Sequence, residues 1–137
     1  GLPSDERVVL ATANLDNAVL VSKSPVGSAG QQWGAPITLK RDTNPAVFND
    51  KESITADQNN ANYVYAVWDR LVFPNERTHG KSYLNTSAFR GPTWFSRTTN
   101  GGSSWETARP IFDPGQNDQT IGNQIVALGN ACSSLTS

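Results

Sequence analysis

The spacing of the apolar residues is the feature that most limits the possible folds of this chain. No segment repeats apolar residues at the 3.6-residue period of an amphipathic helix, and β-branched and aromatic residues gather instead in short runs. Gly, Pro, Asn, Ser and Thr, which favour turns, separate these runs. We expect strands at 7–13, 17–24, 35–41, 52–57, 62–70, 91–98, 109–113 and 123–129. The predicted fold is all-β, with short antiparallel strands.

The composition narrows the possible partners. The 137 residues are enough for one domain with a buried core. With 11 basic and 12 acidic side chains the net charge is −1, so we expect no nucleic-acid partner. No apolar stretch approaches the roughly 18 residues that a membrane-spanning helix needs, so we expect no membrane span.

The Cys, His and Met content adds further expectations. Cys132 is the only cysteine, so no internal disulfide is possible, and a passive thiol is expected. His79 is the only histidine and the sequence shows no cluster of metal ligands, so we expect neither a metal nor a cofactor. The chain has no Met, and its first residues lack the apolar segment of a signal peptide. We therefore expect a section of a longer or processed protein.

Two parts of the sequence share one pattern. Superimposing Trp33 on Trp105, 72 residues later, places Gly30 on Gly102. The Pro-Ile pair at 36–37 then falls near a second Pro-Ile pair at 110–111, with two extra residues in the second copy. A repeated antiparallel unit is typical of a solenoid or a β-propeller, in which sheets stack face to face.

The segment that ends at the second tryptophan resembles the Asp-box, also called the bacterial neuraminidase repeat. The pattern is Ser/Thr-x-Asp/Asn-x-Gly-x-Ser/Thr-Trp, and its residues here are Thr98, Asn100, Gly102, Ser104 and Trp105. In such a turn the Asn side chain binds backbone N–H groups, the glycine takes a positive φ and the indole closes the turn against the core. The earlier copy is degenerate and keeps only Gly30 and Trp33.

This resemblance to sialidase-like propellers implies antiparallel four-stranded blades that are incomplete in one chain. Residues 1–137 would form a single partial unit. It would contain three strands of one blade at 7–41, a full blade at 50–113 with an insertion at 71–90, and the first strand of the next blade at 120–129. The family closes six blades, so the resemblance implies further blades from the same parent chain or from homo-oligomer copies. Three copies of this chain would supply six.

The resemblance also bears on catalysis. The family releases terminal sialic acid with an arginine triad, a Tyr/Glu nucleophilic couple and an aspartic acid–base. Its first arginine belongs to an Arg-Ile-Pro motif that is absent here, because the nearest match, "ARPI" at 108–111, has a different order. No catalytic residue can therefore be assigned. Asp-boxes of the family lie on the rim opposite the active site, so the turn residues are expected to be structural.

Six residues are candidate ligand contacts: Asp50, Glu52, Asp69, Arg70, Tyr83 and Arg90. The two acidic residues at 50 and 52 open the expected innermost strand and would line the central channel, or else form a solvated strand entry. The pair at 69–70 would face a glycan at a strand end, or else cap the strand as an ion pair. The last two lie in the 71–90 loop, where ordinary packing is the alternative.

The resemblance implies that the chain is a portion of a secreted sialidase-like propeller of the exo-α-sialidase family. It would act on or bind glycans, with cell-surface carbohydrate as partner and a secreted or extracellular location. Because the catalytic set is not present in this chain, we do not expect the chain alone to be an active enzyme. The alternative is a non-catalytic structural or adhesion module that self-assembles edge to edge.

Overall fold

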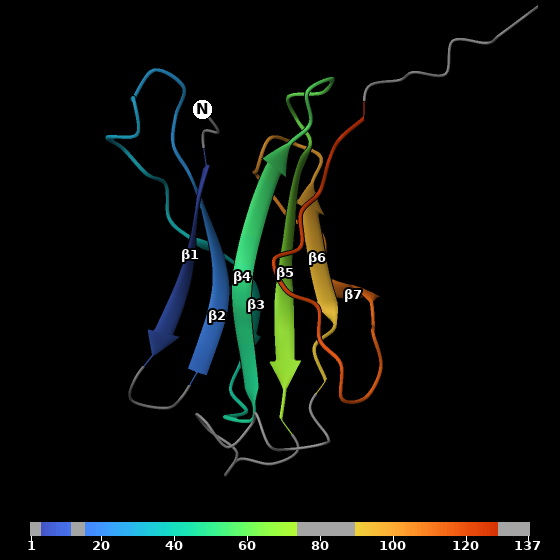
Figure 1. Cartoon of the computed structure of the whole chain (residues 1–137). Coiled ribbons are helices and arrows are strands. Elements are labelled where there is room, and N and C mark those ends of the chain that lie inside the picture. Colours follow the sequence, from blue (N-terminus) through green and yellow to red (C-terminus); the bar gives the residue numbers. More distant parts are fainter. Residues whose placement is uncertain (1–3, 12–15, 74–89, 129–137) are drawn as a thin grey trace, which may run out of the picture.

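The computed structural model describes residues 4–11, 16–73 and 90–128, which form seven strands in two antiparallel sheets (Figure 1). The first sheet has the order β1 (Ser4–Ala11), β2 (Asp16–Lys23) and β3 (Ile37–Asp42). The second sheet has the order β4 (Val47–Ala56), β5 (Val64–Val72), β6 (Thr93–Thr98) and β7 (Arg109–Phe112). Because the described residues contain no helix, the predicted all-β class is confirmed for this part of the chain.

Seven of the eight expected runs lie on strands, and the eighth prediction is wrong. We expected a strand at 123–129, but the described residues 123–128 belong to no β ladder. Upstream of this stretch, one isolated parallel bridge joins Gln119 to Gly91. The apolar run has the composition of a strand, but a strand also needs a hydrogen-bonded neighbour, and the described residues provide none on either side.

The two sheets repeat the same irregularity. In the first sheet Val19 pairs with Lys40 and Leu20 with Thr38, so Leu39 is an extra residue in a β-bulge. In the second sheet Thr93 pairs with Phe112 and Trp94 with Pro110, so Ile111 is the extra residue in an equivalent bulge. Because a bulge bends and twists its strand in a defined way, the two sheets share a local shape as well as a strand order.

An equivalent backbone hydrogen bond closes the turn between β2 and β3 in the first sheet and the turn between β6 and β7 in the second sheet. The Gly34 N–H donates to Lys23 O at 2.9 Å, and the Glu106 N–H donates to Arg97 O at 2.8 Å. These bonds place Trp33 on Trp105, as the sequence repeat predicts. The position of the length difference is corrected, however, because the two extra residues lie in the first turn, before its tryptophan. Pro110 therefore corresponds to Thr38 in the ladder, and the sequence alignment with residue 36 was wrong.

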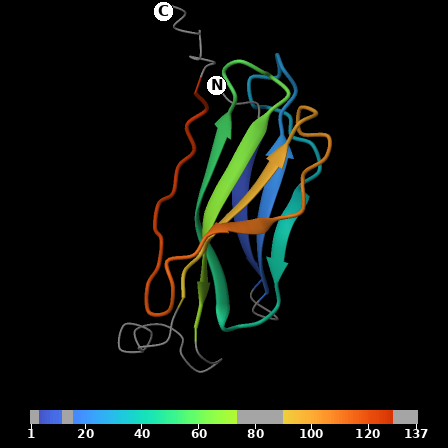
Figure 2. The same ribbon diagram turned by 90° about the vertical axis from the view of Figure 1, so that its right-hand side faces the viewer.

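The sheets pack face to face and share one apolar core. Val19, Val21 and Leu39 of the first sheet meet Ala66 and Trp68 of the second sheet. Trp68 has no exposed surface. The turns at 24–36, 57–63 and 99–108 all lie at one end of this pair of sheets, uppermost in Figure 2. The space between the sheets therefore opens at an end built from turns.

A buried polar network joins the two sheets beside the core. Asn17 donates to Val47 O at 2.7 Å and accepts a bond from Asn49 Nδ2 at 2.5 Å. Asn49 also donates to Asp42 at 2.9 Å and accepts the Trp68 indole N–H at 2.9 Å. Because every one of these groups is satisfied by the opposite or adjacent strand, the network fixes the lateral position of the sheets.

Candidate functional site

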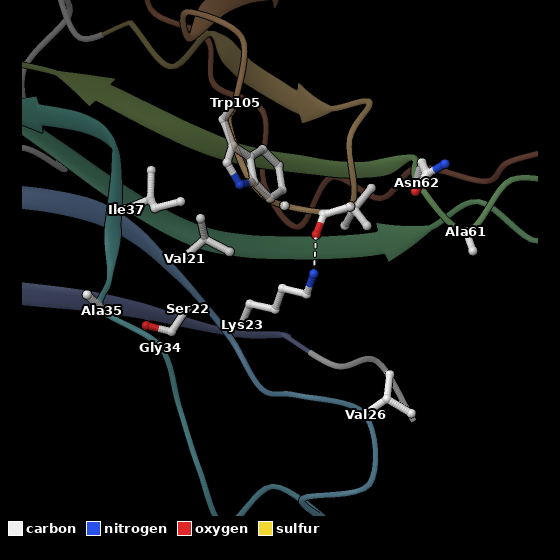
Figure 3. Close-up of a pocket in the computed structure, with 13 residues that line it drawn as sticks. Val21, Ser22, Lys23, Val26, Gly34, Ala35, Ile37, Ala61, Asn62 and Trp105 are labelled. Carbon is white, nitrogen blue, oxygen red and sulfur yellow. Dashed lines mark hydrogen bonds between the residues drawn. The ribbon is translucent and has the colours of Figure 1, made fainter.

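A cleft of about 360 Å³ opens between the sheets at the turn end (Figure 3). One wall comes from the end of β2 and the residues that lead into β3, including Val21, Lys23 and Ile37. The other wall comes from the turn before β5 and from the Trp105 turn (residues 98–105). Its lining is mostly aliphatic and aromatic with a few polar groups, which is the usual character of a small-molecule site.

The side chains of the Trp105 turn hold it closed. The Thr98 hydroxyl donates to Asn100 Oδ1 at 2.9 Å and accepts from the Gly102 N–H at 2.9 Å. Asn100 Oδ1 also accepts from the Ser104 N–H at 3.0 Å, and Asn100 Nδ2 donates to Ser104 Oγ at 2.8 Å. Gly102 has a φ of +84°, which side chains rarely adopt. The cleft therefore has one rigid rim.

The two tryptophan turns share a backbone bond but differ in packing. Trp105 is half-buried and packs against the core between the sheets. Trp33 folds back on its own turn, where its indole N–H donates to Gly30 O at 2.9 Å, and it stays 42% exposed. The difference arises because the Trp105 turn lies against the first sheet. No described sheet lies against the Trp33 turn.

Two polar side chains of the cleft have unused bonding capacity. The Lys23 ammonium reaches across the cleft and donates to Gly101 O at 2.6 Å (Figure 3). Within the described part of the chain no carboxylate pairs with it. The Asn62 backbone carbonyl accepts from the Gly101 N–H at 2.9 Å, and its side-chain amide has no described partner. The Lys23 ammonium and the Asn62 amide therefore both line the cleft, and Asn62 lies at the end away from the Trp105 indole (Figure 3).

Asp50 and Asp69, two of the predicted ligand contacts, are register partners on β4 and β5. Asp69 is only 1% exposed, and its carboxylate accepts bonds from Thr120 Oγ1 at 2.8 Å, the Gly122 N–H at 2.9 Å and Asn123 Nδ2. This carboxylate therefore fastens the segment around residues 120–123 to the sheet, and its oxygens point at protein groups.

Glu52 lies in the bulge of β4 between Asp50 and Ser53, and its environment penalises a negative charge. Burial raises the pKa of this carboxyl, and the charges of Asp50 and Asp69 raise it further, against a lowering hydrogen bond from its own backbone. Its Oε1 atom is buried and has no described hydrogen-bond partner. The structure thus brings three predicted acidic residues near one another, away from the cleft.

The predicted arginines are separated from this acidic group and from each other. Arg70 points to the opposite face of β5 and binds Asp42 through two bonds of 2.9 and 2.6 Å. Arg90 forms a two-bond ion pair with Asp113, one bond being 2.8 Å. The prediction for Tyr83, together with His79 and Cys132, lies outside the described residues.

Sequence reasoning did not identify Lys23 and Asn62 as site residues. Lys23 ends β2 and lies 78 positions from the glycine whose carbonyl it binds. No local motif marks it, because only the packing of the two sheets brings its ammonium to the Trp105 turn. The Gly101-Gly102 pair was the available signal, since adjacent glycines let other groups approach the backbone closely.

The described residues show neither a metal site nor a membrane-spanning helix. No group of three or more His, Cys, Asp or Glu side chains there is arranged to hold a metal ion. No helix in that part of the chain has the length and apolar character needed to cross a membrane.

No known protein family, curated protein or solved structure matches this chain.

Proposed function

We propose that this chain is a section of a sialidase-like propeller that binds glycans and does not hydrolyse them by itself. The observation that supports this proposal most strongly is the structural repeat of the two sheets. Each has the same bulge, the same closing bond and a Gly-x-x-Trp turn, and the sheets stack face to face. Stacked antiparallel sheets with one repeated turn are the architecture that the Asp-box pattern implies.

The cleft supports an acidic sugar as the glycan unit. The Lys23 ammonium, which pairs with no carboxylate among the described residues, would attract a carboxylate, as on a terminal sialic acid, because a charge-assisted bond is stronger than a neutral one. The Asn62 amide offers a donor and an acceptor for hydroxyl groups. The indole of Trp105 and the aliphatic wall suit the apolar face of a sugar ring.

The lining of the cleft does not support hydrolysis. Glycoside hydrolysis needs an acid to protonate the leaving oxygen and a nucleophile or base on the other side of the ring. Among the described residues, no Asp, Glu, Tyr or Arg lines the cleft. Four of the five arginines whose side chains are described, at 41, 70, 90 and 97, form ion pairs with carboxylates of the chain itself, so their guanidinium groups are not free for a substrate carboxylate. The fifth, Arg109, lies over the ring of Phe95 and does not line the cleft.

A binding experiment tests this function. We expect the purified chain to bind sialylated oligosaccharides on a glycan array, and we expect isothermal titration to give a saturable Kd. Lys23→Gln should weaken binding about tenfold, because the charge-assisted bond is lost and the rest of the site is kept. Lys51→Gln is the matched control, since this exposed lysine lies on β4 away from the cleft.

Turnover is measured on the same preparation with a fluorogenic sialoside. We expect no release of the fluorophore by the chain alone, and release would contradict the non-catalytic role. Equal affinity of wild type and Lys23→Gln for sialylated ligands would exclude the cleft as their site. Absence of saturable binding to every glycan on the array would remove the proposed function altogether.

A further inference from the structure

We propose that residues 119–128 are the unpaired first strand of a third sheet, and that the first sheet of a second copy of this chain pairs with it. This interaction is independent of glycan binding, because it uses the face of the second sheet that lies away from the cleft. Three observations carry the proposal.

The first observation is the side-chain alternation of the 119–128 segment. Asn123, Ile125 and Ala127 are half-buried, whereas the residues between and after them are exposed: Gln124, Val126 and Leu128. Val126 is 75% and Leu128 is 81% exposed. A period of two is that of a strand with one face on a sheet. Residues 123–128 thus show the exposure pattern of a strand on the β4–β5 face but form no backbone ladder, and Gly122, with a φ of +66°, turns the chain just before them (Figure 1).

The second observation is how the segment is attached. Asn17 of the first sheet accepts bonds from the backbone N–H and the side-chain amide of Asn49 in β4. Asp69 of the second sheet likewise accepts bonds from the backbone N–H of Gly122 and the amide of Asn123. In both cases a buried side-chain oxygen holds an asparagine of the next segment. The anchoring oxygen comes from β2 in the first sheet and from β5 in the second, so the two attachments share their chemistry and not their strand position.

The third observation is the strand count of the sheets. The second sheet has four strands and begins with β4, but the first sheet has three and begins with β1. Among the described residues β1 pairs only with β2, so its outer edge is free. The described residues thus hold an extra first strand on one side and no first strand on the other. A second copy supplies the missing element in both places.

The pairing that follows is head to tail. The 119–128 segment of one copy would run antiparallel to β1 of the next, as β4 runs antiparallel to β5 within one chain. The segment would then be the fourth strand of that copy's first sheet, and the second sheet of that copy would cover Val126 and Leu128. Pairing would remove two free strand edges, which are otherwise prone to non-specific association. Such a contact gives closed rings or open filaments.

The native mass of the full chain tests this inference. By size exclusion with light scattering we expect a mass of two or more chains, rising with concentration. Val126→Asp should cause loss of this species and leave one chain, because it places a charge on the paired face. Thr43→Asp is the control and should assemble like wild type, since this exposed residue lies in the connection between β3 and β4, at the end of the sheets opposite the Trp33 turn.

Hydrogen exchange locates the contact in the wild-type protein without any substitution. Amides of residues 123–128 and of β1 should exchange more slowly at high concentration than at low concentration, while the connection at 43–46 between β3 and β4 changes less. A single-chain mass at every concentration would overturn the proposal. So would assembly that Val126→Asp leaves unchanged, or protection confined to other strands. Loss of glycan binding by Lys23→Gln would not affect any of these readouts.

Discussion

At the scale of single residues, neighbours in the sequence face different environments. Asp69 and Arg70 follow each other in β5, and strand alternation sends them to opposite faces of the sheet. Asp69 holds the segment around residues 120–123, and Arg70 holds Asp42 of the first sheet. The alternative considered from the sequence, an ion pair between these two neighbours, therefore does not form.

Glu52 gives a prediction at this scale. Its pKa is raised by burial and by nearby carboxylates, so the folded protein binds its proton more tightly than the unfolded chain does. The protein therefore loses stability as the pH rises from the ordinary carboxyl range through the raised pKa. Glu52→Gln removes this charge, and we expect a higher free energy of unfolding at pH 7 and a smaller gain at pH 4, measured by urea denaturation.

The control for this prediction is Glu106→Gln. Glu106 lies at the surface and pairs with Arg97 at 2.6 Å, so its removal should not stabilise the protein. A loss of stability at pH 7 in Glu52→Gln would show that the carboxylate has a favourable partner when ionised.

At the scale of elements, one carboxylate connects β3 with β4 and β5. Asp42 accepts bonds from Arg70 and Asn49, and the guanidinium of Arg70 also lies 4.9 Å from the Trp94 ring. Burial by itself raises the pKa of Asp42, but these hydrogen bonds and the positive charges of Arg70 and Lys40 outweigh it and lower the pKa. The link therefore stabilises the fold most when Asp42 is ionised.

Asp42→Asn tests the link between these strands. The substitution leaves Arg70 without its charged partner, and we expect a loss of about 1–3 kcal/mol in unfolding free energy at pH 7. Because the folded pKa lies below the unfolded value, this stabilisation is present above the unfolded pKa and is lost as the pH falls through the folded pKa. The difference between wild type and variant should therefore shrink in acid, as followed by urea denaturation.

Asp113→Asn is the matched control for this element. Asp113 also binds an arginine through two bonds, but its partner Arg90 is exposed at the surface. We expect a loss below about 1 kcal/mol, because exposed ion pairs contribute little. Equal losses in the two variants would mean that burial of the Asp42 pair has no energetic consequence.

At the scale of the whole molecule, the two repeated turns differ in what borders them. Trp105 packs against the core between the sheets, whereas Trp33 is exposed on the first sheet. We expect Trp105→Ala to cost about 2–4 kcal/mol. Trp33→Ala should cost less than about 1 kcal/mol in a single chain. Thermal unfolding at low protein concentration measures both.

The same comparison at high concentration reports on assembly. If the first sheet of one copy packs on the second sheet of another, the Trp33 turn becomes bordered as the Trp105 turn is now. The cost of Trp33→Ala should then rise with protein concentration, while that of Trp105→Ala stays constant. A concentration-independent cost of Trp33→Ala would contradict this geometry.

Several structural features were predictable because they depend on local chemistry. The β runs and their turns follow from residue types, and the bonds within residues 98–104 join groups at most four positions apart. The candidate site was not predictable in the same way. Its charged group, Lys23, meets the Trp105 turn only after the two sheets have packed. The role of Asp69 likewise depends on a segment more than 50 residues away.

The sequence by itself determined that the chain forms short strands and that each repeated turn has a glycine with a positive φ. It also determined that the described part contains no helix. The tertiary structure decided which apolar runs became strands and which carboxylates are bonded by other groups of the protein. It also decided where the cleft opens. The physical reason is that torsional preferences and short-range hydrogen bonds act within a few residues, whereas a strand, an ion pair or a cleft exists only when distant segments supply the partner. Residues 123–128 show this division most clearly. Their exposure alternates as in a strand, but they form no ladder because no described strand lies beside them to bond with.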